Sequence, residues 1–136
     1  MLDTNVVVSA LVWGGVPYML LQAATDGDIE LCTSPVLLAE LREVLAREHL
    51  ASRLAEKHSS VDEAIALYGE LAIAASPLAV PRVVPNDADD DHVIAAALAA
   101  NAQLIVSGDK HLLDMERYQG IRIVRPGTAV RWVAAG

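Results

Sequence analysis

The chain has 136 residues, 54% of them hydrophobic, which is enough to bury the core of one domain and too much for a disordered segment. Its longest purely apolar run, residues 93–100, is far shorter than the roughly 20 residues of a membrane-spanning helix, so we expect no membrane span. The formal net charge of −8, from 18 acidic and 10 basic residues, argues against a broadly basic surface that holds nucleic acid by phosphate contacts alone.

In chain order, the apolar pattern alternates between short strand-like runs and segments of helical period. This predicts a single α/β domain over residues 1–136 with a parallel sheet. Ser34-Pro35 and the Ser60/Glu63 pair are helix-start signals, a capping serine before proline and a capping box. The expected elements are an apolar, β-branched start over 1–8, a helix over 18–26 ended by Gly27, a strand over 29–33, helices from 34 to about 47 and from 60 to about 75, a strand over 79–84, a buried helix over 91–101, strands over 103–107 and 120–124, and a closing helix over 126–134.

Two further features of the sequence predict the compartment in which the protein occurs. No basic start or apolar stretch precedes Asp3, so we expect no signal peptide. The single cysteine, Cys32, cannot form an internal disulfide, and its apolar context is typical of a buried thiol in a reducing cytoplasm. We therefore expect a cytoplasmic protein. The acidic balance is compatible with metal ions that bridge carboxylates to phosphate, with a basic partner, or with an ordinary soluble surface.

Glu40 lies on the apolar side of the helix predicted after Ser34-Pro35. At about 100° per residue, the apolar residues from Val36 to Leu45 fill an arc of roughly 200°, and Glu40 falls at about 40°, between Val36 and Val44. Glu40 either lies at the edge of this stripe with its carboxylate reaching solvent, or points into a functional pocket. The wheel alone leaves both interpretations open.

Asp91 opens the predicted buried helix and shares a side with Ile94, Ala95 and Leu98. An acid at a helix start caps free backbone amides and interacts favourably with the helix dipole. However, the four acids within residues 87–91 exceed what capping requires, which favours a functional role for Asp91.

Asp3 and Asp109 each follow an apolar run directly, at the carboxyl end of a predicted strand. Parallel α/β sheets bind ligands at that edge. The first strand must be very short, because only Met1 and Leu2 precede Asp3. For Asp109, a turn residue after Gly108 is the alternative interpretation.

Together, Asp3, Glu40, Asp91 and Asp109 are expected to converge. Two carboxylates about 5 Å apart repel by roughly 3 kcal/mol at an effective dielectric near 20, so such a cluster needs a cation or raised pKa values. Oxygen ligands without a cysteine or histidine set favour Mg²⁺ or Mn²⁺ over zinc, and the chemistry that suits them is phosphoryl transfer.

The remaining polar residues offer weaker sites. We expect His49 and His58 to be solvated and His92 to point away from Asp91, whereas His111 could approach the pocket. Ser107 fits a structural hydrogen-bonding role better than a nucleophilic one. The chain has no Ser/His/Asp order and no glycine-rich phosphate loop.

The ordered set of these motifs resembles the PIN-domain family. Asp3-Thr4-Asn5-Val6 and the following Val7 to Leu11 resemble its opening motif, and Ser34-Pro35 through Glu40-Leu41 to Leu45 its second acidic segment. Residues 87–96, with Asp91, are similar to the third segment. Ile105 to Lys110 with Leu112-Leu113 resembles the fourth, and 120–126 the strand after it. The resemblance covers almost the whole chain.

This resemblance implies a Rossmann-like, three-layer α/β/α fold with a central, mostly parallel sheet. It also implies a Mg²⁺- or Mn²⁺-dependent endoribonuclease that leaves 5′-phosphate and 3′-hydroxyl ends. Asp3, Glu40, Asp91 and Asp109 match the family's metal-binding catalytic acids, and Asn5 and Ser107 its supporting polar positions. The subgroup it resembles is that of VapC-like toxin components of toxin–antitoxin systems, which implies an RNA substrate, a homodimer and an antitoxin that blocks the pocket.

Two departures from the family pattern stand out. Its first strand normally has several apolar residues before the motif aspartate, so either the true start lies upstream of Met1 or the strand is completed differently. The acidic balance leaves the RNA-binding surface open. The candidates to hold phosphate, each also explicable as a solvated helix charge, are Arg42, Arg47, Arg53, Lys57 and Lys110.

Two other functions compete with a ribonuclease. A catalytically inactive PIN fold could act as a binding or scaffold module, although the retained set of four acids argues against it. A haloacid-dehalogenase-like phosphatase would need D-x-D after the first strand, but here the second acid is replaced by Asn5 and the general acid is missing.

Overall fold

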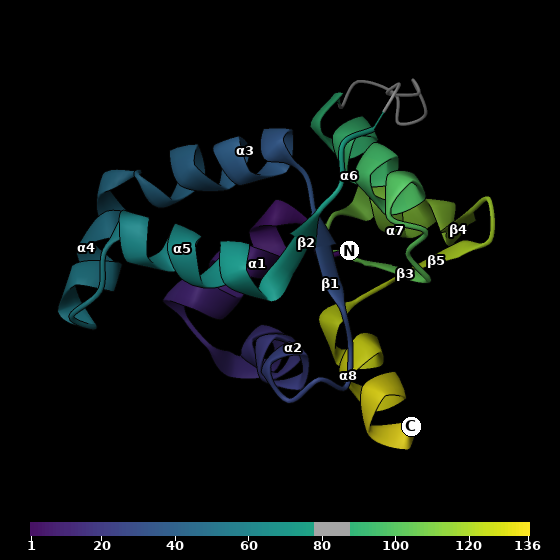
Figure 1. Cartoon of the computed structure of the whole chain (residues 1–136), viewed down its shortest axis with the longest axis horizontal. Helices are drawn as coiled ribbons and strands as arrows, with labels where there is room; N and C mark the ends of the chain where they lie inside the picture. Colours follow the sequence, from purple (N-terminus) through teal and green to yellow (C-terminus); the bar gives the residue numbers. More distant parts are fainter. Residues whose placement is uncertain (78–87) are drawn as a thin grey trace.

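A computed structural model describes residues 1–77 and 88–136. Short strands lie between helices in this structure (Figure 1). The predicted strand over 79–84 lies outside the described residues. The elements are α1 (Thr4–Val12), α2 (Gly15–Thr25), β1 (Leu31–Thr33), α3 (Pro35–Leu45), α4 (Glu48–Glu56), α5 (Val61–Leu71), β2 (Ala72–Ala74), α6 (Ala88–Ala99), β3 (Leu104–Val106), α7 (Lys110–Met115), β4 (Arg117–Tyr118), β5 (Ile121–Val124) and α8 (Pro126–Ala135).

The strands form two small groups around the first residues of the chain. β1 pairs in parallel with β2, and β3 pairs in parallel with β5, to which β4 adds an antiparallel edge. Leu2 forms a parallel bridge to Val106, where the Val106 N–H donates to the Met1 carbonyl (2.8 Å) and the Asp3 N–H donates to the Val106 carbonyl (2.9 Å). On the other side, Cys32 Sγ lies 3.9 Å from Met1 Sδ. The expected very short first strand is therefore present and ends at Asp3.

Successive strand residues point into two separate hydrophobic cores. Leu31, Val106 and Val124 belong to the core beneath α1, α2, α5 and α8, whereas their neighbours Cys32, Ile105 and Ile123 belong to the core beneath α6 and α7. Alternation of this kind is what a strand covered on both faces requires. It confirms the predicted three-layer α/β/α arrangement with mostly parallel strand pairing.

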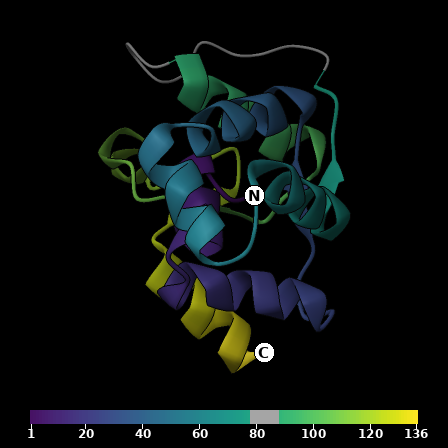
Figure 2. The same ribbon diagram turned by 90° about the vertical axis from the view of Figure 1, so that its left-hand side faces the viewer.

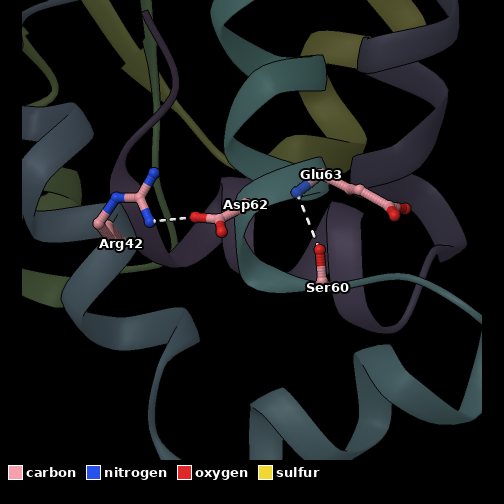
Figure 3. A network of polar contacts seen from close by, with 4 residues as sticks. All are labelled: Arg42, Ser60, Asp62 and Glu63. Carbon is pink, nitrogen blue, oxygen red and sulfur yellow. Dashed lines mark hydrogen bonds and ion pairs between the residues drawn. The ribbon is translucent and has the colours of Figure 1, made fainter.

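The predicted helix starts are formed by the side chains that indicated them. Ser34 Oγ accepts a hydrogen bond from the Leu37 N–H (3.3 Å), and Ser60 Oγ accepts one from the Glu63 N–H (3.1 Å; Figure 3). Each satisfies a backbone donor that the first turn of a helix leaves free. α2 ends where predicted, since Gly27 takes the left-handed conformation (φ +82°) that glycine adopts without a steric cost.

Several segments differ from the sequence-based expectation: α4, α7 and β4 are not among the expected elements, and residues 6–8 and 72–74 take another conformation than expected. The β-branched residues Val6 to Val8 lie in α1 rather than in a strand, because burial of all three in the core outweighs their modest preference for strands. Ala72 to Ala74 form β2 rather than the end of a helix. Pairing with β1 and the hydrogen bond from the Ala75 N–H to the Thr33 carbonyl (2.8 Å) override the helix preference of alanine.

Contacts between helices complete the outer layers. α2 and α8 lie side by side below the strands (Figure 2), and Arg42 Nη1 donates to Asp62 Oδ1 at 2.6 Å, which ties α3 to α5 (Figure 3). Because this ion pair is exposed, it contributes at most about 1 kcal/mol.

Within the described ranges no single helix is long and apolar enough to cross a bilayer, although α1 and α2, bent by 94°, reach that length together.

Candidate active site

The buried polar side chains of the described residues gather at strand ends and at the start of α6. Burying a polar group costs free energy unless it has a hydrogen-bonding or ionic role, so such a concentration marks a functional region. α3 and α6 both begin near the upper end of the β1–β2 pair (Figures 1 and 2). These buried polar residues are Asp3, Thr4, Thr33, Ser34, Asp90, Asp91 and Ser107.

Asp3 is held in an unusual way for a residue at a helix start. It occupies the N-cap position of α1, where an aspartate ordinarily accepts a hydrogen bond from the first helical turn, but its side chain makes no such bond. Instead, Asp3 Oδ2 accepts a hydrogen bond of 2.8 Å from Ser107 Oγ. The carboxylate, only 6% exposed, is thereby turned toward the carboxyl end of β3.

Ser107 links Asp3 to the next acid along the chain. Its hydroxyl oxygen accepts a hydrogen bond from the Asp109 N–H (2.9 Å), and its own N–H donates to the Val124 carbonyl (3.0 Å) at the end of β5. Ser107 is fully buried. Its hydroxyl donates to Asp3, which fits a residue that orients a carboxylate rather than a nucleophile.

Asp109 caps α7 and contributes to the same edge. Asp109 Oδ1 accepts a hydrogen bond from the His111 N–H (2.7 Å), so the turn and capping interpretation describes part of what this residue does. The side chain is half-buried, whereas His111 is exposed. His111 thus contacts Asp109 through its backbone.

Asp91 lies in the first turn of α6 and is 1% exposed. α6 packs against both β1 and β3, and its residues from Val93 to Ala97 are buried, as the apolar pattern predicted. Asp90 is buried as well, at 4% exposure. The sequence argument assigned Asp90 to capping and missed this burial.

Glu40 and Asn5 are less buried than Asp3 and Asp91. On α3 the buried stripe consists of Leu37, Leu41 and Leu45, while Val36 is 51% exposed. The apolar arc predicted from the wheel is therefore narrower than expected, and Glu40, which is half-buried, lies at its edge. Asn5 is exposed on α1.

The comparison with protein families decides the fold family. A family model described as PIN domain matches residues 1–111, a range that includes all four acids, Asn5 and Ser107. The chain belongs to the PIN-domain family. A PIN domain is a nuclease-type fold, and its members are generally hydrolases that typically use divalent metals. No curated protein and no solved structure matches the chain.

The donors of this PIN domain are of the kind that a hard divalent cation prefers. Carboxylates and a hydroxyl are oxygen donors, which Mg²⁺ and Mn²⁺ prefer. Among residues 1–77 and 88–136, however, no three histidine, cysteine, aspartate or glutamate side chains lie where they could hold one ion. The expected meeting of the four acids is thus not seen there. Mg²⁺ is commonly held by one or two carboxylates with water and substrate phosphate, so the residues that would supply a carboxylate are the buried acids Asp3 and Asp91.

A cavity of the PIN domain lies away from these acids. It measures about 790 Å³ and runs between the two strand groups, lined by residues before and within β1, residues before β3, and Met1 and Leu2. None of the four predicted acids lines it. We therefore give it no part in the proposed chemistry.

Two of the arginines predicted to contact phosphate are already in ion pairs. Arg42 is bound to Asp62, and Arg53 Nη1 lies 3.1 Å from Glu56 Oε2. Each of these arginines already has a carboxylate partner, which weakens its attraction for phosphate. Arg47, Lys57 and Lys110 are exposed.

Proposed function

We propose that this PIN domain is a Mg²⁺- or Mn²⁺-dependent endoribonuclease. The observation that carries the proposal is the Asp3 carboxylate, which is buried at the carboxyl end of β3 and is bound by Ser107 instead of capping its own helix. An acid that gives up a capping bond worth about 1 kcal/mol is suited to a role in binding rather than in folding. Asp91, buried at the start of α6, supplies a second carboxylate.

In the proposed mechanism, each side chain has a separate task. A bound divalent cation would supply activation of water and neutralisation of charge on the phosphate. Asp3 and Asp91 would hold the cation, Ser107 orients Asp3, and Asp109 lies next to Ser107 at the same edge. Half-buried Glu40 acts from the rim, directly or through water. Hydrolysis adds water across the bond between phosphorus and the 3′ oxygen, leaving a 5′-phosphate and a 3′-hydroxyl.

Cleavage of mixed single-stranded RNAs with Mn²⁺ tests this function. We expect Asp3→Asn to lower activity by about a thousandfold or more, because losing a metal-holding charge removes several kcal/mol of stabilisation and each 1.36 kcal/mol is tenfold in rate. Asp26→Asn, a matched change at an exposed position, should cleave as the wild type does. Equal activity of the wild type and Asp3→Asn would refute the proposal.

The biological role that we propose is that of the toxin component of a toxin–antitoxin system. The support is the resemblance of the ordered motifs to VapC-like proteins. On this proposal the protein is cytoplasmic, forms a homodimer and is inhibited by an antitoxin that covers the pocket. Expression in bacterial cells should arrest growth for the wild type and not for Asp3→Asn.

A second candidate is a catalytically inactive PIN domain that acts as a binding or scaffold module. It is favoured by the lack of a three-ligand group in the part of the chain that the structure describes. A folded wild-type sample that binds neither Mn²⁺ nor Mg²⁺ in calorimetry, and cleaves no RNA, would support this candidate over the first.

A further inference from the structure

The positive charge of the chain is concentrated in its last twenty residues. All 18 acidic residues lie at or before Glu116, whereas residues 117–136 contain four of the ten basic residues and no acid. This segment therefore has a formal charge of +4, and residues 1–116 have −12. The segment builds β4, β5 and α8 on one side of the molecule (Figure 1).

We use the name arginine surface for the exposed side chains Arg117, Arg122, Arg125, Arg131 and Trp132. None of these arginines forms an ion pair within the described ranges, in contrast to Arg42 and Arg53. Arg117 and Arg122 are directly opposite each other in the antiparallel β4–β5 pair. Like charges in that position repel, and an anion bound between them would remove the repulsion.

The described residues include two arginine–tryptophan pairs, and these differ in whether the arginine is also bound to a carboxylate. The Arg122 guanidinium lies 4.6 Å from the centre of the Trp132 ring, and the Arg53 guanidinium 5.0 Å from that of Trp13. Arg53 is also bound to Glu56, whereas Arg122 is bound to no carboxylate in the described part. A flat, cationic, exposed stack of this kind is suited to bind a nucleobase beside a phosphate.

The arginine surface reaches the carboxyl ends of β3 and β5, where Ser107 binds Asp3. Arg125 directly follows Val124, whose carbonyl accepts the hydrogen bond from the Ser107 N–H (3.0 Å). Arg131 folds back over the first turn of α8, where its Nη2 donates to Thr128 Oγ1 (3.2 Å). Arg122 lies three residues before Arg125, about 10 Å along the extended chain. The surface thus runs from Trp132 to the end of β5, beside Ser107.

We propose that the arginine surface binds single-stranded RNA, with phosphates on the arginines and a base on the Arg122–Trp132 pair, and leads the strand to Asp3 and Ser107. The strongly acidic remainder of the chain repels RNA, so binding is confined to this surface. The identity of the ligand rests on the proposed ribonuclease function. The binding itself needs no divalent metal.

Fluorescence anisotropy of a labelled oligouridylate, in EDTA and at several KCl concentrations, tests the surface separately from cleavage. The double variant Arg122→Ala/Arg125→Ala should bind about tenfold more weakly. Its slope of log affinity against log [KCl] should fall by about 1.4, or about 0.7 for each lost phosphate contact. Arg47→Ala is the matched control, because Arg47 is an exposed arginine at the start of α4, on the opposite side of Figure 1.

Tryptophan fluorescence distinguishes RNA from an acidic polypeptide. In a Trp13→Phe background, oligouridylate should quench Trp132 through base stacking, whereas polyglutamate should not. In a Trp132→Phe background, Trp13 should remain unquenched by the same RNA. Quenching of Trp13 and Trp132 alike would show that any exposed tryptophan responds, and would overturn the assignment.

The remaining outcomes also decide the proposal. Equal losses for Arg47→Ala and the double variant, or no loss in the double variant, would overturn it. Displacement of the RNA by polyglutamate at the same charge concentration would replace RNA by an acidic protein segment as the partner. RNA binding with the expected losses, combined with no cleavage in Mn²⁺, would retain this inference and refute the ribonuclease proposal.

Discussion

The edge formed by Asp3, Ser107 and Asp109 lies next to the arginine surface at the end of β5. The acids and the arginines are nevertheless exposed to solvent to opposite degrees. The carboxylates of Asp3 and Asp91 are almost fully buried, whereas the four arginines are exposed. Charge removed from water interacts strongly with an ion at short range, and charge in solvent attracts a polyanion weakly and with a dependence on salt. This difference is the reason for proposing chemistry at the buried acids and substrate capture at the exposed arginines.

The largest expected effect comes from the second buried acid, Asp91. Asp91→Asn should lower RNA cleavage in Mn²⁺ by about a thousandfold or more, as Asp3→Asn should, because several kcal/mol of stabilisation are lost. RNA binding in EDTA should stay within about twofold of the wild type, since the arginine surface is intact. Steady-state cleavage and anisotropy measure the two quantities, with Asp114→Asn as the exposed control. Parallel loss of binding and cleavage would remove the separation between the two regions.

An intermediate effect is expected for Ser107, which connects Asp3 to the end of β5. Ser107→Ala deletes the hydrogen bond to Asp3 but no carboxylate, so activity should fall about 10- to 100-fold, the range found for groups that orient metal ligands. The apparent Mn²⁺ affinity should fall with it, and Ser107→Thr, which keeps the hydroxyl, should recover part of both. Ser52→Ala, an exposed change on α4, is the control. An unchanged Mn²⁺ dependence in Ser107→Ala would mean that Ser107 serves the fold alone.

The smallest expected effect concerns a buried ionisable group away from both regions. Tyr68 on α5 is 1% exposed, and its hydroxyl has no hydrogen-bond partner in the described part. Burial, and to a smaller extent Cys32, raises the pKa of the Tyr68 hydroxyl well above its ordinary value. Tyr68→Phe should therefore keep cleavage unchanged and alter the free energy of unfolding by no more than about 1 kcal/mol, in the stabilising direction.

The pH dependence of Tyr68 has a defined sign. Because its pKa is higher in the folded state, the unfolded chain loses the proton first, so stability is full below about pH 10 and falls above it by about 1.4 kcal/mol per pH unit. Tyr68→Phe should lack this component of the alkaline loss, and Tyr18→Phe, at a side chain that is 43% exposed, should retain it. Urea unfolding at neutral and alkaline pH measures both. The same alkaline loss in all three proteins would show that Tyr68 is not responsible.

Local signals in the sequence predicted much of this fold. Ser34 and Ser60 cap the helices that they indicated, Gly27 ends α2, and the apolar run of α6 is buried. What the sequence could not supply was pairing between distant segments. β2 is a strand because β1 lies beside it, and Val6 to Val8 are helical because α1 buries them, so tertiary contacts overrode local preference in both places.

The candidate site could be predicted from the sequence only in part. Asp3 and Asp91 stood out as acids in apolar surroundings, and both are buried. For Glu40 the wheel left an edge position and a pocket position open, because a wheel does not show which half of an apolar arc faces the core; the half-buried Glu40 lies at the edge of the buried stripe. Burial of Asp90 was missed because the helix pattern singled out Asp91 and left Asp90 among the acids available for capping. The arginine surface was missed because Arg117 and Arg122 come together only through strand pairing, although the absence of acids after Glu116 was a readable signal.

Binding of Mn²⁺ in the absence of RNA, measured by calorimetry, tests most directly whether the buried acids hold a divalent cation. We expect the wild type and Asp26→Asn to bind with equal affinity, and Asp3→Asn and Asp91→Asn to bind at least about tenfold more weakly. No heat of binding from folded wild-type protein, or the same affinity in all four proteins, would contradict the account.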